Sequence, residues 1–248
     1  MNKSNNDGYR ESTLKEQFRA IVYGIPVVGS LSQKALATWR DIWNPFPGSV
    51  DYWDRRYARG GTSGAGSYGR LADWKAEVVN DFVRRRQVQS VIEFGCGDGN
   101  QLSLAKYPKY IGLDVSKTAI ALCKERFQND VTKNFFLYDS LSFVDRHGIF
   151  RADLAMSLDV IYHLVEDAIY DVYMSHLFAA AERYVLIYSS DHASDASASH
   201  VRHRKFTTWI DERRPNWSLM QKIENPFAGG SRRAGAACAV HFFLYQKL

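Results

Sequence analysis

Residues 91–100 of this 248-residue chain read Val91-Ile92-Glu93-Phe94-Gly95-Cys96-Gly97-Asp98-Gly99-Asn100. The apolar, β-branched start of this stretch predicts a buried parallel strand over 90–94. The glycines predict a tight turn, followed by a helix from about 100 to 105. A glycine turn between a strand and a helix lets backbone amides approach a ligand more closely than any side chain would allow. We therefore expect a nucleotide-like ligand at the carboxyl end of this strand.

Apolar runs alternate with helix-period segments after residue 70, which is the pattern of an α/β protein. Parallel strands are predicted at 90–94, 110–114, 135–138, 152–158 and 184–188, and helices at 71–86, 117–128 and 167–182. Ser116 is expected to cap one helix and Thr207 another. The strands at 218–223 and 240–245 have no clear helix between them and should pair antiparallel. The predicted fold is Rossmann-like: a mainly parallel seven-stranded sheet with a C-terminal antiparallel hairpin and helices on both faces.

Two further predicted strands are followed by carboxylates at the same edge of the sheet. Asp114 ends the second strand, about twenty residues after the glycines, where an acidic residue can accept hydrogen bonds from both ribose hydroxyls. Asp139 closes the third strand. Open α/β sheets bind ligands outside the carboxyl ends of their strands, so these groups are candidate ligand contacts.

From the glycine loop to its end, the chain resembles the class I S-adenosylmethionine-dependent methyltransferases, which carry an acidic residue followed by GxGxG. The resemblance implies that Glu93 organises the amides around the methionine end of the donor, and that Asp139 reads the adenine amino group. A dinucleotide oxidoreductase is disfavoured, because its fingerprint places glycine where this chain has Asn100. The donor contacts that the resemblance implies are Tyr57, Glu93, Gly95, Cys96, Gly97, Gly99, Asp114, Val115, Asp139, Ser140 and Leu158.

The chain divides near residue 70 into an N-terminal part, 1–70, and the methyltransferase domain, 71–248. The segment 52–57, Tyr-Trp-Asp-Arg-Arg-Tyr, resembles the aromatic segment that small-molecule members place over the donor, and with the glycine-rich stretch after it predicts a lid. A surface loop followed by aromatic core anchors is the alternative. The apolar stripe over 31–43 predicts an amphipathic helical arm, which docks either on the protein's own core or on a membrane surface.

Asp159 and His163 are the candidate catalytic residues, since both follow the strand at 152–158. On a helical turn they would share a face and form a carboxylate-oriented imidazole base. Alternatively, Asp159 caps the next helix and His163 packs beneath it. A hydroxyl acceptor requires such a base, whereas an amine needs less help. The predicted reaction is O-methylation of a small molecule or glycan, with N-methylation, an NAD(P)-dependent oxidoreductase and an RNA methyltransferase as alternatives.

Composition limits the partners and the setting. The net charge of +5 is spread along the chain, so no specific nucleic-acid partner is expected. Three cysteines without CxxC spacing and a polar N-terminus without a signal peptide predict a cytoplasmic protein, at the inner face of the membrane if the arm binds lipid. No metal is expected: the Asp and His residues over 191–203 match no metal motif and are interpreted as a solvated substrate loop.

Overall fold

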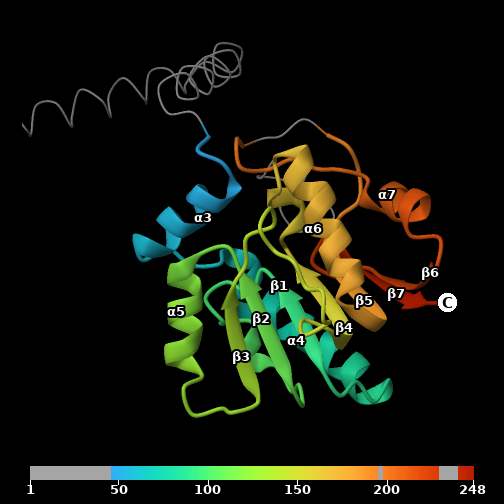
Figure 1. Ribbon diagram of the computed structural model, residues 1–248, viewed down its shortest axis with the longest axis horizontal. Helices are drawn as coiled ribbons and strands as arrows, with labels where there is room; N and C mark the ends of the chain where they lie inside the picture. Colours follow the sequence, from blue (N-terminus) through green and yellow to red (C-terminus); the bar gives the residue numbers. More distant parts are fainter. Residues whose placement is uncertain (1–45, 195–197, 229–239) are drawn as a thin grey trace, which may run out of the picture. The chain divides into compact units, whose positions relative to one another are not determined.

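Seven strands form one sheet in the order β3-β2-β1-β4-β5-β7-β6 (Figure 1). The strands are β1 Val91–Phe94, β2 Tyr110–Asp114, β3 Lys133–Leu137, β4 Ala152–Leu158, β5 Ala181–Ser190, β6 Trp217–Ile223 and β7 Val240–Lys247. The first five strands run parallel to one another, whereas β7 pairs antiparallel with both β5 and β6. The predicted sheet and its antiparallel finish are confirmed.

The computed structural model describes residues 46–194, 198–228 and 240–248. Pro47 to Leu248 belong to one compact unit, so the aromatic and glycine-rich stretch is part of the same unit as the sheet. The predicted arm over 31–43 lies outside the described residues. Within the described part of the chain, no helix has the length and apolar character to cross a membrane.

Helices cover both faces of the sheet (Figure 1). α4 Gly69–Arg85 and α5 Lys117–Arg126 cover one face, and α6 Asp167–Ala179 and α7 Phe206–Arg213 cover the other. α3 Ser49–Ala58 lies beyond the ends of the strands, next to α5. Successive side chains of a strand point to opposite faces. Leu154 and Met156 of β4 accordingly join the apolar cluster under α4 and α5, whereas Ala155 joins the cluster under α6 and α7. Both faces of the central strands are therefore buried.

Two local predictions were wrong. In place of a helix over 100–105 there is one turn of 3-10 helix, Leu102–Leu104, because only ten residues separate Gly99 from the start of β2. Thr207 does not cap α7, whose N-cap is Lys205. Instead, the amide and hydroxyl of Thr207 both donate to the carboxylate of Asp191, which comes from the loop after β5. The carboxylate of Asp191 thus accepts hydrogen bonds at the start of α7 in place of a local capping side chain.

Ser116 caps α5 as predicted, and it also ties this helix to α3. Its hydroxyl oxygen accepts a hydrogen bond from the Ala119 amide at 3.1 Å and donates to Asp54 Oδ1 at 2.7 Å. Ser116 is fully buried. Its loss therefore removes a cap and leaves the Asp54 carboxylate with only the longer hydrogen bond from the Thr118 amide, at 3.3 Å.

We expect Ser116→Ala to lower the free energy of unfolding by about 1–2 kcal/mol, the cost of a lost helix cap. Urea unfolding followed by circular dichroism measures this change. Ser175→Ala is the matched control, because that hydroxyl only bonds the Asp171 carbonyl within its own helix. An equal loss in both variants would contradict the capping role.

Candidate active site

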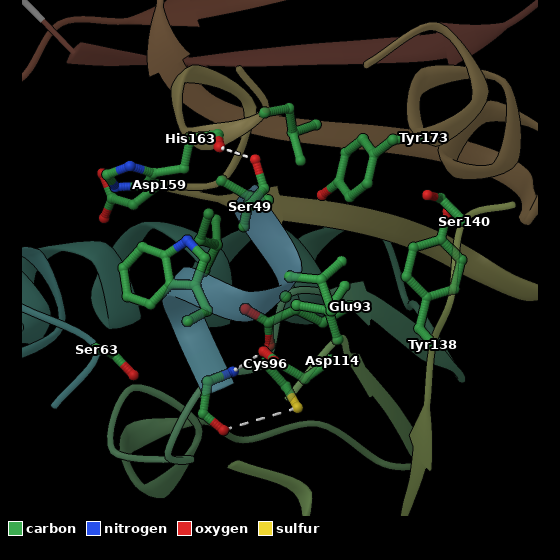
Figure 2. A pocket seen from close by; sticks show the side chains of 18 of the residues that line it. Ser49, Ser63, Glu93, Cys96, Asp114, Tyr138, Ser140, Asp159, His163 and Tyr173 are labelled. Atoms are coloured by element: carbon green, nitrogen blue, oxygen red, sulfur yellow. Dashed lines mark hydrogen bonds between the residues drawn. The ribbon is translucent and has the colours of Figure 1, made fainter. Parts of the chain in front are cut away.

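A cavity lies at the carboxyl edge of the sheet, where the tips of β2, β1 and β4 are adjacent (Figure 2). Most of the predicted site residues line it: Tyr57, Glu93, Gly95, Cys96, Gly97, Asp114, Val115, Ser140, Leu158, Asp159 and His163. Trp53, Ser63 and Ser67 line it too and belong to the stretch that was predicted as a lid, whereas Gln101 also lines it and was not singled out from the sequence. The structure therefore brings the glycine loop, two strand tips and the α3 segment around one space.

Gly99 and Asp139 are predicted donor contacts that the structure places elsewhere. Gly99 faces α5: a Cβ there would lie 3.0 Å from the Cys123 sulfur. Asp139 is exposed and accepts hydrogen bonds from the Leu141 amide at 3.0 Å and the Ser142 hydroxyl at 2.8 Å. Its carboxylate thus holds the turn after β3, and buried Ser140 is the residue of this turn that lines the cavity.

Two buried carboxylates form the floor of the cavity. Asp114 accepts hydrogen bonds from the Gly97 amide at 2.8 Å and the Ser116 amide at 2.9 Å. Glu93 accepts one from the Tyr110 hydroxyl at 2.6 Å. Burial raises the pKa of Asp114 to about 6 and that of Glu93 to about 7, against the opposing effect of these hydrogen bonds. The floor therefore gains negative charge as the pH rises through 6 and 7.

Position 97 requires a glycine for two separate reasons. Its φ angle is +57°, in the left-handed region that side chains disfavour. A Cβ at this position would also lie 2.3 Å from Ser63 Oγ and 2.9 Å from the Tyr57 hydroxyl. The bare backbone thus admits the segment that follows α3 as well as leaving room for a ligand.

Asp159 does not form the predicted pair with His163. Its carboxylate accepts hydrogen bonds from Lys75 Nζ of α4 and from the Tyr162 hydroxyl, both at 2.7 Å. Lys75 is fully buried. Asp159 also has a φ of +60°, which is a strained conformation for a residue with a side chain. A charged partner, a hydroxyl and the backbone together fix this carboxylate.

His163 is oriented by a backbone carbonyl instead of a carboxylate. Its Nδ1 donates to the carbonyl oxygen of His200 at 3.0 Å, which places the proton on that nitrogen. The ring meets Trp53 edge to face at 4.9 Å. Burial lowers the pKa of His163 to about 4, so the ring is neutral at pH 7. Its Nε2 makes no hydrogen bond to the described residues and carries a free lone pair beside the cavity.

The loop after β5 is held by protein contacts. Asp191 binds Thr207, and His203 Nδ1 lies 2.7 Å from the Ser190 hydroxyl. Within the ranges that the structure describes, no three Asp, Glu, His or Cys side chains are arranged to hold a metal ion. Asp195, the remaining carboxylate of the loop, lies outside those ranges.

The comparisons with known proteins agree with this geometry. Residues 68–225, more than half of the chain, match a family model described as a methyltransferase domain. The chain belongs to this methyltransferase family. Its predicted recognition as a class I, S-adenosylmethionine-dependent methyltransferase is thereby confirmed. No curated protein sequence matches the chain.

Solved structures share the fold of this methyltransferase at low sequence identity. The N-methyltransferase NodS from Bradyrhizobium japonicum WM9, in complex with S-adenosylhomocysteine, has a TM-score of 0.61 at 15% identity, over 81% of this chain and 98% of NodS. Magnesium protoporphyrin IX methyltransferase from Synechocystis PCC 6803, with bound S-adenosylmethionine, has a TM-score of 0.58 at 15% identity. The match covers 83% of this chain and 100% of that enzyme. The methyltransferase domain of bacterial CtHen1 has a TM-score of 0.57 at 18% identity, over 72% of this chain and 99% of that domain.

The segment after α3 in this methyltransferase is fastened to the glycine loop through Asp98. The Ser63 amide donates to Asp98 Oδ2 at 2.9 Å, and the Asp98 amide donates back to Ser63 Oγ at 3.0 Å. The Tyr68 hydroxyl also donates to Oδ2, at 2.8 Å. Although burial raises it, these hydrogen bonds leave the pKa of Asp98 below its usual value. Asp98 was not predicted, because it stands among the glycines as an ordinary turn residue.

We expect Asp98→Asn to loosen this segment, because the single amide oxygen of asparagine cannot accept both from the Asn100 amide and from Ser63 and Tyr68, and the remaining hydrogen bonds lose their charged acceptor. Hydrogen exchange of the amides over 62–68 should accelerate roughly tenfold or more, the value of hydrogen bonds to a charged group. Asp139→Asn is the control, since that carboxylate holds only its own surface turn. Unchanged protection over 62–68 in Asp98→Asn would show that the segment is held by other contacts.

Proposed function

We propose that this methyltransferase transfers a methyl group from S-adenosylmethionine to a hydroxyl group of a small, uncharged molecule such as a phenol or a sugar. One observation carries the proposal. His163 is neutral, it is oriented by the His200 carbonyl, and its Nε2 lone pair is free at the cavity. A hydroxyl is the acceptor that needs such a group, because it loses its proton as the new bond forms.

The charge of the cavity supports a cationic donor. Glu93, Asp114 and Asp159 are among its lining residues, whereas no lysine or arginine is found among the described residues that line it. S-adenosylmethionine carries a sulfonium, an ammonium and a carboxylate, so it is a net cation, and opposite charges in a buried site attract strongly. Gly95 and Gly97 of the glycine loop have no side chains, so the donor can approach the backbone closely there.

The same charge argues for an uncharged acceptor. An acceptor with a phosphate or carboxylate would face Glu93 and Asp114, and no lysine or arginine is among the described lining residues to pair with it. The bonds to the acceptor would have to come from neutral groups such as His163 and Trp53. This supports a small-molecule or glycan hydroxyl over the 2′-hydroxyl of an RNA, which is flanked by phosphates.

We expect donor binding to release protons between pH 6 and 7, because a bound cation favours the ionised forms of Glu93 and Asp114, whose pKa values are about 7 and about 6 in the empty site. Below this pH window both carboxyl groups are protonated, and they must lose their protons when the donor binds. Affinity for S-adenosylmethionine therefore rises with pH through 6 to 7 and then levels off.

Isothermal titration calorimetry in two buffers of different ionisation enthalpy measures these protons. NAD is the competing ligand to titrate in parallel. Binding of NAD without binding of S-adenosylmethionine or S-adenosylhomocysteine would overturn the proposed function in favour of an oxidoreductase.

We expect His163→Asn to lower turnover of hydroxyl acceptors about 10²- to 10⁴-fold, the usual contribution of a general base. Asparagine keeps an N–H donor for the His200 carbonyl but offers no basic nitrogen, so donor affinity should be unchanged. The assay follows labelled methyl groups into a panel of phenols, sugars and amines. His147→Asn, on the surface, is the control.

The acceptor panel also separates O-methylation from N-methylation. A free amine presents its own lone pair, so amine turnover should depend little on His163. If wild-type enzyme methylates amines but not hydroxyls, and His163→Asn keeps that activity, the acceptor proposed above is wrong and the donor assignment stands.

A further inference from the structure

One face of α3 contacts both residues of the hydrogen bond that orients His163. Ser49, Tyr52 and Trp53 share this face, because residues three and four positions apart on a helix are neighbours. The Ser49 hydroxyl lies 2.9 Å from the His163 carbonyl (Figure 2), and the Trp53 ring meets the His163 ring edge to face. The Tyr52 ring stacks on the His200 ring, with 4.5 Å between the ring centroids and 12° between the ring planes. The helix therefore contacts both partners of that hydrogen bond.

The position of His200 determines how firmly the His163 ring is held. His163 Nδ1 lies 3.0 Å from the His200 carbonyl oxygen, and the two imidazole rings are nearly parallel, with 5.6 Å between their centroids. His200 lies in a turn of the connection between β5 and α7. Two residues further on, the Arg202 amide donates to the Tyr162 carbonyl at 2.8 Å. Residues in such connections keep more freedom than residues in strands or helices, so the packing of the His200 side chain bears on where its carbonyl lies.

Tyr52 acts on the cavity only through its neighbours. It does not line the cavity, in contrast to Trp53 next to it in the sequence. A stacked aromatic pair stabilises a contact beyond the area that it buries. Misplacement of a reacting group by about 1 Å can cost about a hundredfold in rate. A contact that holds the His200 carbonyl in place can therefore affect turnover without touching the donor or the acceptor.

We propose that Tyr52 is a positioning residue: by stacking on the His200 ring, it holds the backbone carbonyl that orients the His163 base. The inference rests on the proposed function, because it takes His163 as that base. The same helix is joined to the floor of the cavity, since Asp54 accepts from the Ser116 hydroxyl and the Ser116 amide donates to Asp114. One helix thus connects the floor of the cavity with the group that orients the base.

Tyr52→Leu removes the aromatic ring and keeps a residue that favours a helix. We expect turnover of hydroxyl acceptors to fall roughly ten- to a hundredfold, because a loosely held imidazole spends less time in the productive orientation. Binding of S-adenosylhomocysteine, measured by calorimetry, should be unchanged, since Tyr52 does not line the cavity. Tyr52→Phe restores the ring and should recover the lost turnover.

A double-mutant cycle measures whether Tyr52 acts through His163. In the His163→Asn background the base is already lost, so the addition of Tyr52→Leu should lower turnover no further. A residue that only stabilises the fold would lower turnover by the same factor in both backgrounds. His200→Ala removes the stack from its other side and keeps the carbonyl, so it should lower turnover as Tyr52→Leu does.

Arg55→Gln is the matched control on α3. The exposed Arg55 side chain is paired with Asp51, one turn away on the same helix, and it does not line the cavity. This variant should turn over hydroxyl acceptors like the wild type. The melting temperature of each variant shows whether it is folded. If Tyr52→Leu does not fold, His200→Ala decides the same question.

The failure of this inference differs from the failure of the proposed function. If Tyr52→Leu and His200→Ala leave turnover unchanged, or lower it equally in the wild-type and His163→Asn backgrounds, Tyr52 is not a positioning residue and His163 remains the base. An equal loss in Tyr52→Phe and Tyr52→Leu also overturns the role of the ring. If His163→Asn itself leaves hydroxyl turnover unchanged, or the wild type does not bind S-adenosylmethionine, the proposed function fails.

Discussion

The buried carboxylate of Asp114 is the interaction on which the site depends. One oxygen accepts from the Gly97 amide and the other from the Ser116 amide, so a single side chain joins the tip of β2, the glycine loop and the start of α5. Ser116 extends this connection to α3 through Asp54. Hydrogen bonds to a buried charge are stronger than neutral ones. The same group that positions the loop therefore also fixes the segment that covers it.

This arrangement has an electrostatic consequence. Removing carboxylates from water disfavours their charged form, and the raised pKa values of Glu93 and Asp114 record that cost. Lys75, which does not line the cavity, is paired with Asp159, and no lysine or arginine is among the described lining residues. A bound cation supplies the positive charge that the empty site lacks. Ligand binding and ionisation of the floor are thus two aspects of one equilibrium.

The sequence predicted the fold well because the fold rests on repeating patterns, and it predicted the site unevenly because the site rests on long-range contacts. Strand β4 was predicted to the residue, since a buried parallel strand is a continuous apolar run. Asp139 was expected in the cavity from its place at a strand tip, yet two local donors hold it in the turn. Lys75 lies on the buried face of α4, between the apolar residues Ala72 and Val79. A lysine on an apolar face is a signal of a buried partner, but only the folded chain shows which one.

The ion pair between Lys75 and Asp159 determines which side chain of the site is free to take a proton. Asp159 is held in a left-handed conformation, which costs about 1–3 kcal/mol for a residue with a side chain. A conformation of this kind persists only where its surroundings enforce it, and Lys75, Tyr162 and the Tyr188 carbonyl do so here. A carboxylate paired with a buried ammonium is a poor base, because accepting a proton would leave that ammonium unpaired. In the function proposed above, the ion pair therefore leaves the role of base to His163, whose turn, Ile161–His163, begins two residues after Asp159.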